Sequence, residues 1–357
     1  YNYSQSFSIP NMNNHIKKLI ERYNYQFPKE LIAQEPASPR DSAQLLIYNQ
    51  KNHSIKFDNF FNLTKYLPHG SILVFNETEV IPARLVLRKE TGGKVKALFI
   101  EESHELVKVM ADRKLIPLSK LFINKKLFFT VQKQEEKFYL LQPSFNLRIL
   151  SQILEKYGET PIPPYIKNTP LKEGELREKY QTIFAKTKGS VAAPTASLHF
   201  TKRLFKKIKT QGFGVEFITL HVGLGTFAPL EEGNFKLGRL HEEKYFIDPR
   251  VACALNHAKK IGRPIIAVGT TTARTLESEY LKNGKLKNLN GATDLFIREV
   301  YRFSFIDGLI TNFHVPHSSL LMLVSALVGR ERLLELYKTA IRKKFRLFSF
   351  GDGMLIY

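Results

Sequence analysis

The repeated order of strand, turn and helix in the second half of the chain constrains the fold more than any other feature. Three apolar runs there have the length and composition of strands followed by turns: 214–220, 264–268 and 309–313. The segments between and after them have the period of helices: 201–210, 249–260, 272–282, 318–328 and 331–344. Strands that alternate with helices favour a mainly parallel sheet with helices on both faces. We therefore expect an α/β fold.

An earlier part of the chain has a different period. Between Ser71 and Leu141, six short segments have the pattern of strands with no helix between them: 72–75, 81–87, 94–100, 105–110, 126–131 and 137–141. Close strands of this kind predict a small antiparallel β-barrel or sandwich. We expect a barrel domain at 71–149, inserted into a discontinuous α/β domain of residues 28–70 and 150–357. Residues 1–27 are predicted to form an N-terminal extension.

Composition limits the class of protein. The chain has 357 residues, of which 43% are hydrophobic and 24% charged, as in ordinary soluble proteins. No apolar stretch approaches the roughly 20 residues of a membrane helix, and the first residues lack the pattern of a secretory signal. The single cysteine, Cys253, cannot form an internal disulfide, and we expect it to be a small core residue. These features predict a cytoplasmic protein without membrane association.

The net charge of +21 favours an anionic partner. An excess of this size attracts polyanions, although a lysine-rich composition can also produce nothing more than solvated surfaces. Part of the charge lies on the predicted helix at 201–210, where Thr201 is a candidate N-cap. On that helix Lys202, Arg203 and Lys206 face outward and are candidate phosphate contacts.

Five segments at predicted strand ends carry the candidate functional residues: 189–201, 219–227, 269–278, 311–316 and 350–353. In an open α/β sheet, ligands bind at the carboxyl ends of the strands, so we expect these segments to converge on one crevice. Three of them contain a histidine, namely His199, His221 and His314. A neutral imidazole can accept or donate a proton near pH 7. A zinc site is the alternative for such residues, but the spacing of these histidines matches no common zinc motif.

The segment Gly269-Thr-Thr-Thr-Ala-Arg274 joins a predicted strand to a helix. Backbone N–H groups at a helix N-terminus, together with the hydroxyl groups of Thr270 and Thr271, can hold an anion or a polar ligand. Ordinary helix capping is the alternative interpretation. Arg274 could add a charge-assisted hydrogen bond, and Glu277 could bind a ribose hydroxyl or pair with Arg274. The segment matches neither the dinucleotide-binding nor the P-loop pattern.

Two acidic residues are further candidates. Glu242 follows His241 and could take part in acid–base chemistry, or it could lie in a solvated loop. Asp352 lies between two glycines, which permit close approach to a ligand but are also typical of turns.

Together these segments resemble one family, the S-adenosylmethionine:tRNA ribosyltransferase-isomerases of queuosine biosynthesis. The resemblance runs from about Phe27 to the C-terminus and consists of motifs that match in sequence order. Among them are Val80-Ile-Pro-Ala-Arg-Leu85, Ala193-Pro-Thr-Ala196, Leu220-His-Val-Gly223, Arg274-Thr-Leu-Glu-Ser278 and Asn312-Phe-His314. The resemblance implies an α/β domain with an inserted β-barrel, which agrees with the fold predicted above.

The resemblance also implies a reaction. S-adenosylmethionine would be a consumed substrate, whose ribosyl group is transferred and rearranged onto a 7-aminomethyl-7-deazaguanine at the wobble position of a tRNA. The products would be epoxyqueuosine-tRNA, adenine and methionine. No metal or redox cofactor is implied. We expect a monomer whose partners are tRNA and S-adenosylmethionine.

Such a reaction needs a base, because the sulfonium acidifies the adjacent C5′ protons, and an acid that assists the departure of adenine. We hypothesise that His221 or His314 is the base and that Glu242 or Asp352 orients it or handles the aminomethyl group. The expected substrate contacts are Arg84, Thr195, His199, Gly223, Gly269, Thr270, Thr271, Arg274, Glu277 and Asn312. The expected tRNA contacts are Lys202, Arg203 and Lys206.

The chain departs from the family pattern at a few positions. Glu79 stands where the family usually has an arginine, and Ser197 stands where it usually has a glycine. Two alternatives to the implied activity stay open: a noncatalytic tRNA-binding paralogue and an S-adenosylmethionine-dependent RNA methyltransferase.

Overall fold

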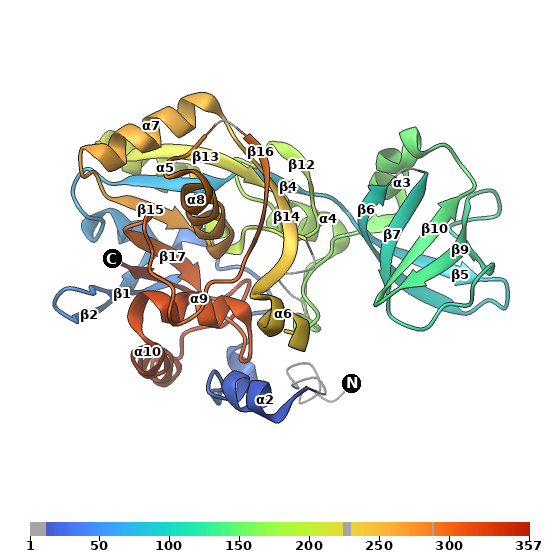
Figure 1. Ribbon diagram of the computed structural model, residues 1–357, viewed down its shortest axis with the longest axis horizontal. Coiled ribbons are helices and arrows are strands. Elements are labelled where there is room, and N and C mark those ends of the chain that lie inside the picture. The colour runs from blue at the N-terminus through green and yellow to red at the C-terminus, as the bar shows by residue number, and fades with distance from the viewer. Residues whose placement is uncertain (1–11, 104, 224–229, 288) are drawn as a thin grey trace.

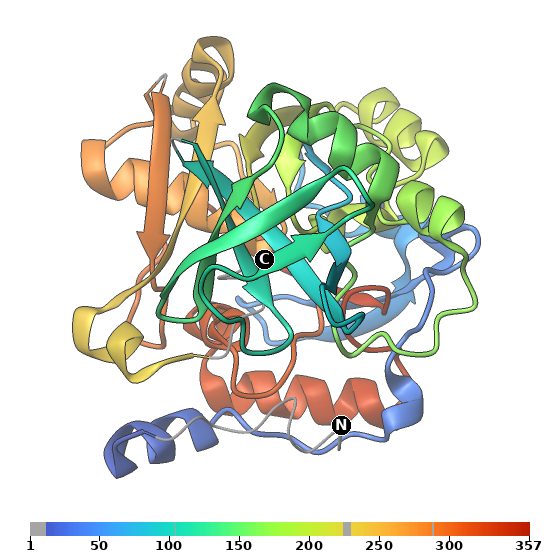
Figure 2. The ribbon, with the colours of Figure 1, turned by 90° about the vertical axis from the view of Figure 1, so that its right-hand side faces the viewer.

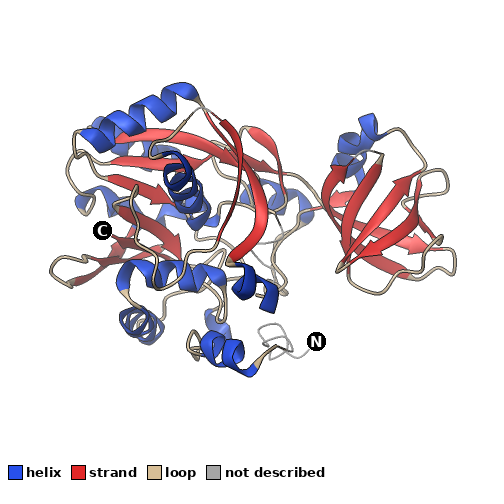
Figure 3. Ribbon diagram, viewed as in Figure 1, coloured by secondary structure: helices blue, strands red, loops and turns tan. Residues whose placement is uncertain are grey.

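The computed structural model describes residues 12–357 apart from 104, 224–229 and 288 (Figure 1). It consists of a mixed sheet flanked by helices and a small closed β-barrel that stands to one side of it (Figures 1 and 3). The predicted fold class, an α/β domain with an inserted antiparallel barrel, is confirmed.

Nine strands form the main sheet, in the order β16-β14-β13-β3-β15-β17-β18-β1-β2. Their bounds are β1 Gln44–Tyr48, β2 Ile55–Asn59, β3 Ile72–Asn76, β13 Gly214–Leu220, β14 Arg239–Ile247, β15 Ile265–Val268, β16 Leu289–Leu295, β17 Gly308–Asn312 and β18 Gly353–Ile356. The central strands β13, β3, β15 and β17 are parallel neighbours. Antiparallel pairs flank this centre: β14 pairs antiparallel with β13 and with β16 on one side. On the other side β18 is antiparallel to β17, β1 is parallel to β18, and β2 is antiparallel to β1. The sheet is therefore mixed, with a parallel centre.

Helices cover both faces of this sheet because the side chains of each strand alternate between two cores. On β3, Ile72 and Val74 face the larger core, whereas Leu73 and Phe75 face the other. The larger core is covered by α7 Pro249–Lys260, α8 Thr270–Asn283, α9 Ser319–Val328 and α10 Arg330–Arg342. The other core is covered by α5 Lys202–Thr210 and the short 3-10 helix Phe60–Lys65.

The helices begin where the sequence predicts caps. The side chain of Thr201 accepts a hydrogen bond from the backbone N–H of Leu204 at 3.2 Å, which confirms Thr201 as the N-cap of α5. Helix α7 begins after Asp248, whose side chain accepts from the N–H of Arg250. The expectation that Cys253 is a core residue is wrong, because it lies on the exposed side of α7.

The inserted domain is a six-stranded antiparallel barrel that closes through the pairing of β5 with β8 (Figure 2). Its strands are β5 Arg84–Lys89, β6 Lys94–Ser103, β7 Leu106–Ala111, β8 Lys120–Phe122, β9 Phe128–Glu135 and β10 Phe138–Pro143. Helix α3, Leu150–Tyr157, packs against the barrel, and its Leu150 and Leu154 belong to the barrel core. The barrel therefore has a hydrophobic core of its own.

The predicted boundaries of the barrel domain need correction. Strand β3 belongs to the main sheet, and the next strand, β4 Thr78–Val80, pairs with β12 Thr187–Ser190 outside the barrel. At the other end, α3 and the short strand β11 Gly158–Glu159 extend the barrel domain beyond residue 149. The chain enters on β5 and leaves on β11, which pair with each other.

The predicted N-terminal extension is, where the structure describes it, part of the folded body. Helix α2 Asn14–Glu21 and the segment after it pack on the larger core, and Ile20, Tyr23 and Tyr25 are buried. The hydroxyl group of Tyr25 donates to the carbonyl oxygen of His314 at 2.5 Å. Residues 1–11 of the predicted extension lie outside the described residues. The remaining helices are α4 Glu173–Lys179 and α6 Glu232–Leu237. No helix in the described part of the chain is long and apolar enough to span a membrane.

Candidate active site

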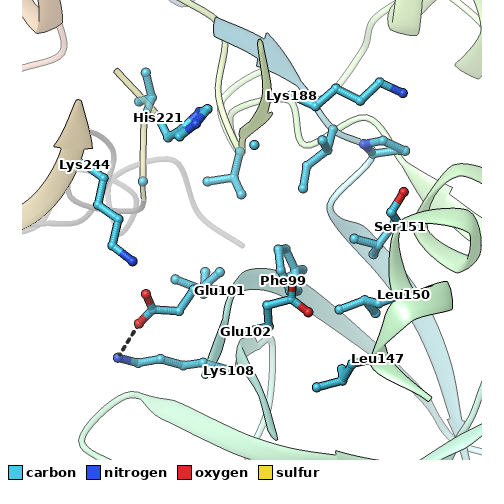
Figure 4. A pocket seen from close by; sticks show the side chains of 18 of the residues that line it. Phe99, Glu101, Glu102, Lys108, Leu147, Leu150, Ser151, Lys188, His221 and Lys244 are labelled. Atoms are coloured by element: carbon cyan, nitrogen blue, oxygen red, sulfur yellow. Dashed lines mark hydrogen bonds and ion pairs between the residues drawn. The ribbon is translucent and has the colours of Figure 1, made fainter. Parts of the chain in front are cut away.

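Two cavities meet at the carboxyl ends of the central strands. The larger, of about 710 Å³, lies between the barrel and the sheet domain, and we call it the interdomain cavity (Figure 4). The smaller, of about 60 Å³, lies where α8 begins and β17 ends, and we call it the α8 cavity. Val222, just after β13, lines both of them. Four of the five predicted strand-end segments therefore converge, on two adjoining cavities instead of one crevice, whereas segment 350–353 lines neither of them. Residues 224–227 of the segment 219–227 lie outside the described residues.

His221 follows β13 and lines the interdomain cavity. Its ring packs directly on the backbone of Gly189, where a Cβ atom would lie only 2.9 Å from the imidazole and where φ is +144°. Only glycine allows this contact without strain. Nδ1 of His221 lies 2.9 Å from Oγ1 of Thr78. Partial burial, assisted by the positive charge of Lys244, lowers the pKa of His221 below its ordinary value of 6.5, so the ring is neutral at pH 7.

The other two candidate histidines are almost fully buried, and burial lowers the pKa of each to about 3. His314 lines the α8 cavity, and its Nε2 lies 2.7 Å from Oγ1 of Thr311. His199 stacks on the ring of Phe60 at a centroid distance of 4.1 Å. Its Nε2 lies 3.2 Å from Nδ2 of Asn312. His199 therefore supports the side chain of Asn312, which in turn lines the α8 cavity.

Five of the predicted substrate contacts line the α8 cavity: Thr195, Gly269, Thr270, Thr271 and Asn312. Gly269 has a φ of +95°, a conformation that L side chains rarely adopt, and it is the N-cap of α8. Because Gly269 has no side chain, the first N–H groups of the helix, at residues that line the cavity, have no side-chain cap.

Arg274 has a partner that the sequence interpretation missed. Its Nη2 donates to Oε2 of Glu243 on β14, and both residues are only 2% exposed. Oε1 of Glu243 in turn accepts the backbone N–H of Gly223 at 3.1 Å. Arg274 and Glu243 therefore hold Gly223, two residues after His221. The alternation of β14 could have identified Glu243, because it is in phase with the buried residues Tyr245 and Ile247.

Glu277 is not a substrate contact. Its carboxylate accepts four hydrogen bonds of 2.9 Å, from the hydroxyl group of Tyr301 and the backbone N–H groups of residues 304–306. The side chain is completely buried and has no capacity left for a ribose hydroxyl. The predicted ribose contact and the predicted pairing with Arg274 are both wrong, because Glu277 holds the segment that precedes β17.

The carboxylate of Asp352 is also bound by other groups of the protein itself. Its carboxylate accepts the backbone N–H groups of Gln44 at 3.0 Å and Arg346 at 2.7 Å, and it pairs with the guanidinium of Arg346 at 3.2 Å. It is 1% exposed and ties the beginning of β18 to the beginning of β1. Among the residues described, it lines neither of the two cavities.

Two of the predicted arginine contacts are engaged elsewhere. The guanidinium of Arg84 donates to the carbonyl oxygen of Ile162 at 2.7 Å, and burial lowers the pKa of this guanidinium from its ordinary value. Arg203 forms a bidentate ion pair with the buried Asp41, and both nitrogen–oxygen distances are 2.6 Å. Lys202 and Lys206 are exposed on α5, on the face of the sheet domain covered by that helix.

The charges around the interdomain cavity are partly compensated. Lys108 pairs with Glu101 at 3.3 Å (Figure 4). Lys188 pairs with Glu155 at 2.8 Å. Arg148 and Lys244 are exposed and have no ion-pair partner among the described residues. Glu242 is exposed at the same rim and also lines a neighbouring hollow of about 790 Å³.

The two departures from the family pattern are accommodated locally. Glu79 lies 3.8 Å from Lys188 and adds to the charge compensation there. Ser197 lies in the 3-10 helix Thr195–His199 and is not among the described residues with positive φ, so serine is not strained at this position. Within the described ranges, no group of three or more His, Cys, Asp or Glu side chains is arranged to hold a metal ion.

Known proteins resemble this chain over nearly its whole length. The family model described as a queuosine biosynthesis protein matches residues 20–356. The chain is also similar to proteins named S-adenosylmethionine:tRNA ribosyltransferase-isomerase from three bacteria. The one from Thermoanaerobacter sp. is 44% identical over 94% of this chain and 98% of its own length. The protein from Fusobacterium nucleatum is 44% identical over 95% of this chain and 97% of its own length. The protein from Aquifex aeolicus is 43% identical over 94% of this chain and 99% of its own length.

A solved structure agrees with this match. The crystal structure of S-adenosylmethionine tRNA ribosyltransferase from Thermotoga maritima is 31% identical in sequence and superimposes with a TM-score of 0.55. The comparison covers 94% of this chain and all of that one. The likeness therefore spans the sheet domain, the barrel and the strand-end segments that form the two cavities. By sequence and by structure, the chain belongs to the queuosine biosynthesis protein family.

Proposed function

We propose that this protein is an S-adenosylmethionine:tRNA ribosyltransferase-isomerase. It transfers and rearranges the ribosyl group of S-adenosylmethionine onto 7-aminomethyl-7-deazaguanine at the tRNA wobble position, and it releases adenine and methionine. Relatives of this name that match at 43–44% identity support the proposal. The observation that carries it is the arrangement of two cavities of different size that share a wall at Val222, beside His221.

The interdomain cavity suits the modified nucleotide. Its volume of about 710 Å³ lies within the range of ligand pockets, and it is open to solvent between the two domains. Phe99 and Phe138 line it and add apolar surface to its wall. Arg148 and Lys244 at its rim supply positive charge for the flanking phosphates. The wobble base leaves the anticodon stack to enter this cavity.

His221 is the better candidate for the base that removes the C5′ proton. A histidine whose conjugate acid has a pKa of about 3, as for His314, holds a proton too weakly to be an effective base near pH 7. His221 is neutral at pH 7 and only partly buried. The Thr78 hydroxyl reaches the carbonyl oxygen of Thr187 at 3.4 Å. When the Thr78 hydroxyl donates to Thr187, its oxygen accepts a hydrogen bond from Nδ1–H of His221. Nε2 of His221 then keeps its lone pair for the substrate.

Glu242 is suited to the incoming amine. Its exposed carboxylate lies at the rim of the interdomain cavity, where it can accept hydrogen bonds from the ammonium of the aminomethyl group. Asp352 acts at a distance, as a positioning residue that joins β18 to β1.

We further propose that the reaction takes place in the cytoplasm and needs no metal or redox cofactor. Transfer and rearrangement of a ribosyl group involve no net change in oxidation state. A monomer is sufficient in this proposal, because one chain supplies both cavities and His221.

One incubation separates the possible activities. The protein is mixed with S-adenosylmethionine and a tRNA that carries 7-aminomethyl-7-deazaguanine, and the small products are measured by chromatography. Release of adenine and methionine in equal amounts is the expected result. Formation of S-adenosylhomocysteine would instead identify a methyltransferase, and tRNA binding without either product would identify a noncatalytic binding protein.

A further inference from the structure

The α8 cavity presents hydrogen-bonding groups that the fold itself does not use. Helix α8 has 14 residues, and its first two, Thr270 and Thr271, are each 6% exposed. The first N–H groups of a helix lack intrahelical acceptors, and a buried helix end normally has a side-chain cap. The N-cap Gly269 offers none. The hydroxyl groups of Thr270 and Thr271 also have no hydrogen-bond partner among the described residues.

Asn312 indicates a ligand independently. It is 3% exposed at the end of β17 and lines the same cavity. Its Nδ2 lies 3.2 Å from two acceptors, Nε2 of His199 and the carbonyl oxygen of Phe348. These acceptors determine which way the amide is turned, because the neutral His199 can accept at Nε2. Oδ1 of Asn312 is left buried without a partner among the described residues, which is rare unless a ligand supplies the donor.

Charge and size restrict the ligand. Among the described residues, the lining contains no Lys, Arg, Asp or Glu, and its one histidine, His314, is neutral. A ligand group with no net charge therefore fits. The volume of about 60 Å³ is small beside the roughly 300–1,000 Å³ of typical ligand pockets, which favours a small ligand group. Val315, Leu320 and Phe348 add apolar surface for a short methylene chain.

We infer that the α8 cavity binds the α-amino acid end of S-adenosylmethionine. The carboxylate accepts hydrogen bonds from the N–H and hydroxyl groups of Thr270 and Thr271, and the ammonium donates to Oδ1 of Asn312. This inference rests on the proposed function. With the amino acid end held there, the sulfonium and ribose extend past Val222 towards His221.

The ligand side of the inference is tested on the unmodified protein, without tRNA, by isothermal titration. The probes are L-methionine, S-adenosylmethionine, decarboxylated S-adenosylmethionine, 4-(methylsulfanyl)butanoate, which lacks the amino group, and 5′-methylthioadenosine, which lacks the amino acid. L-methionine is expected to bind saturably. Loss of the carboxylate or of the amino group is expected to weaken binding at least about 10-fold, because each removes charge-assisted hydrogen bonds. Equal affinity of either truncated compound, compared with its complete parent compound, would overturn the inference.

The protein side is tested with Thr270→Val/Thr271→Val. Valine keeps the shape of threonine and removes hydroxyl groups that the fold does not use, so the thermal unfolding curve is expected to be unchanged. The double variant is expected to bind L-methionine at least about 10-fold more weakly and 5′-methylthioadenosine as before. Thr275→Val is the control on the same helix, because the hydroxyl group of Thr275 already donates to the carbonyl oxygen of Thr271 at 3.0 Å. Parental affinity for L-methionine in the double variant would overturn the inference.

Failure of this inference can be distinguished from failure of the proposed function. Binding of L-methionine is measured without turnover, so it can be found in a protein that releases no adenine from S-adenosylmethionine. That outcome would refute the proposed function and leave the inference standing. Turnover by a protein whose affinity does not depend on the carboxylate or the amino group would refute the inference alone.

Discussion

At the scale of single residues, burial determines what each histidine can do. His199 and His314 lie among apolar side chains and are neutral well below pH 7, because a charged imidazole would lose its hydration there. His221 is only partly buried and lines the interdomain cavity. The three histidines occur in similar positions in the sequence, at or just after strand ends, but they differ in surroundings and therefore in chemistry.

Replacing His221 with alanine is expected to lower turnover about 100-fold or more, the usual contribution of a general base. Affinity for S-adenosylmethionine should change little, because the inferred amino acid contacts lie in the α8 cavity. Single-turnover release of adenine measures the first effect, and titration measures the second. His69→Ala, at an exposed position, is the matched control. Full turnover in His221→Ala would remove His221 as the base.

The two buried histidines predict a loss of stability in acid. Each has a pKa of about 3 in the folded protein and an ordinary value of 6.5, so the unfolded chain binds more protons between these limits. Their stabilising contribution is fully present above pH 6.5 and is lost as the pH falls from 6.5 towards 3. The expected slope is about 1.4 kcal/mol per pH unit for each histidine. Urea unfolding at several pH values measures it.

His199→Gln separates this effect from other acid-labile interactions. The variant is expected to have a shallower dependence of unfolding free energy on pH below 6.5, whatever its stability at neutral pH. His69→Gln is the control at an exposed position. An unchanged slope in His199→Gln would contradict the assignment of His199 as a neutral, buried group.

At the scale of elements, the ion pair between Arg274 and Glu243 joins α8 to β14 and, through Gly223, to the loop after β13. Three elements that contribute to the site therefore depend on one buried contact. Because both partners are almost completely inaccessible to water, removing one charge leaves the other uncompensated.

Glu243→Gln is expected to lower the free energy of unfolding by about 3 kcal/mol or more, since a buried pair that loses one partner becomes strongly unfavourable. The double variant Glu243→Met/Arg274→Met should recover much of this loss, because it buries no isolated charge. Urea denaturation of the three proteins provides the measurement. A double variant less stable than Glu243→Gln would show that the pair stabilises by more than mutual charge compensation.

Helix α5 stays a predicted contact for tRNA phosphates. Arg203 is held by Asp41, so the test uses Lys206, which is exposed. Lys206→Glu is expected to weaken tRNA binding and to reduce the dependence of affinity on salt, because fewer counterions are released. Lys260→Glu makes the same change on α7, which covers the opposite face of the sheet. Equal effects of both variants on the salt dependence would indicate a response to net charge alone.

At the scale of the whole molecule, the barrel is a module with its own core that forms one wall of the interdomain cavity. Arg84 on its first strand pairs with Glu159 on β11, so the chain enters and leaves on neighbouring strands, about 5 Å apart. A short linker can therefore replace the barrel without stretching the sheet domain.

Replacement of residues 84–159 by a short glycine–serine linker is expected to leave a folded sheet domain that still binds L-methionine. Turnover with tRNA should fall below detection, because the wall that carries Phe99 and Lys108 is removed from the interdomain cavity. Circular dichroism and titration with L-methionine check the first expectation, and adenine release checks the second. Normal turnover without the barrel would exclude the interdomain cavity as the site of the modified nucleotide.

Much of this architecture follows from local patterns. The period of apolar residues identified α5, α7 and α9 to within a residue or two at each end, and it identified the barrel as a set of close strands. The pattern did not show that β3 belongs to the main sheet, because its apolar run resembles the barrel strands that follow it. It also missed the packed position of residues 12–27, whose partners lie near the C-terminus.

The sequence alone determined the fold class, the family and the segments that gather at the strand ends, since hydrophobic period, caps and motifs are local properties of a chain. Only the tertiary structure decided what individual charged residues do. Glu277, Asp352 and Arg203 looked like ligand contacts, but each is paired with groups that the fold brings close from elsewhere in the chain. A buried polar group must find a partner to offset its lost hydration, and which partner is in reach depends on how distant segments pack.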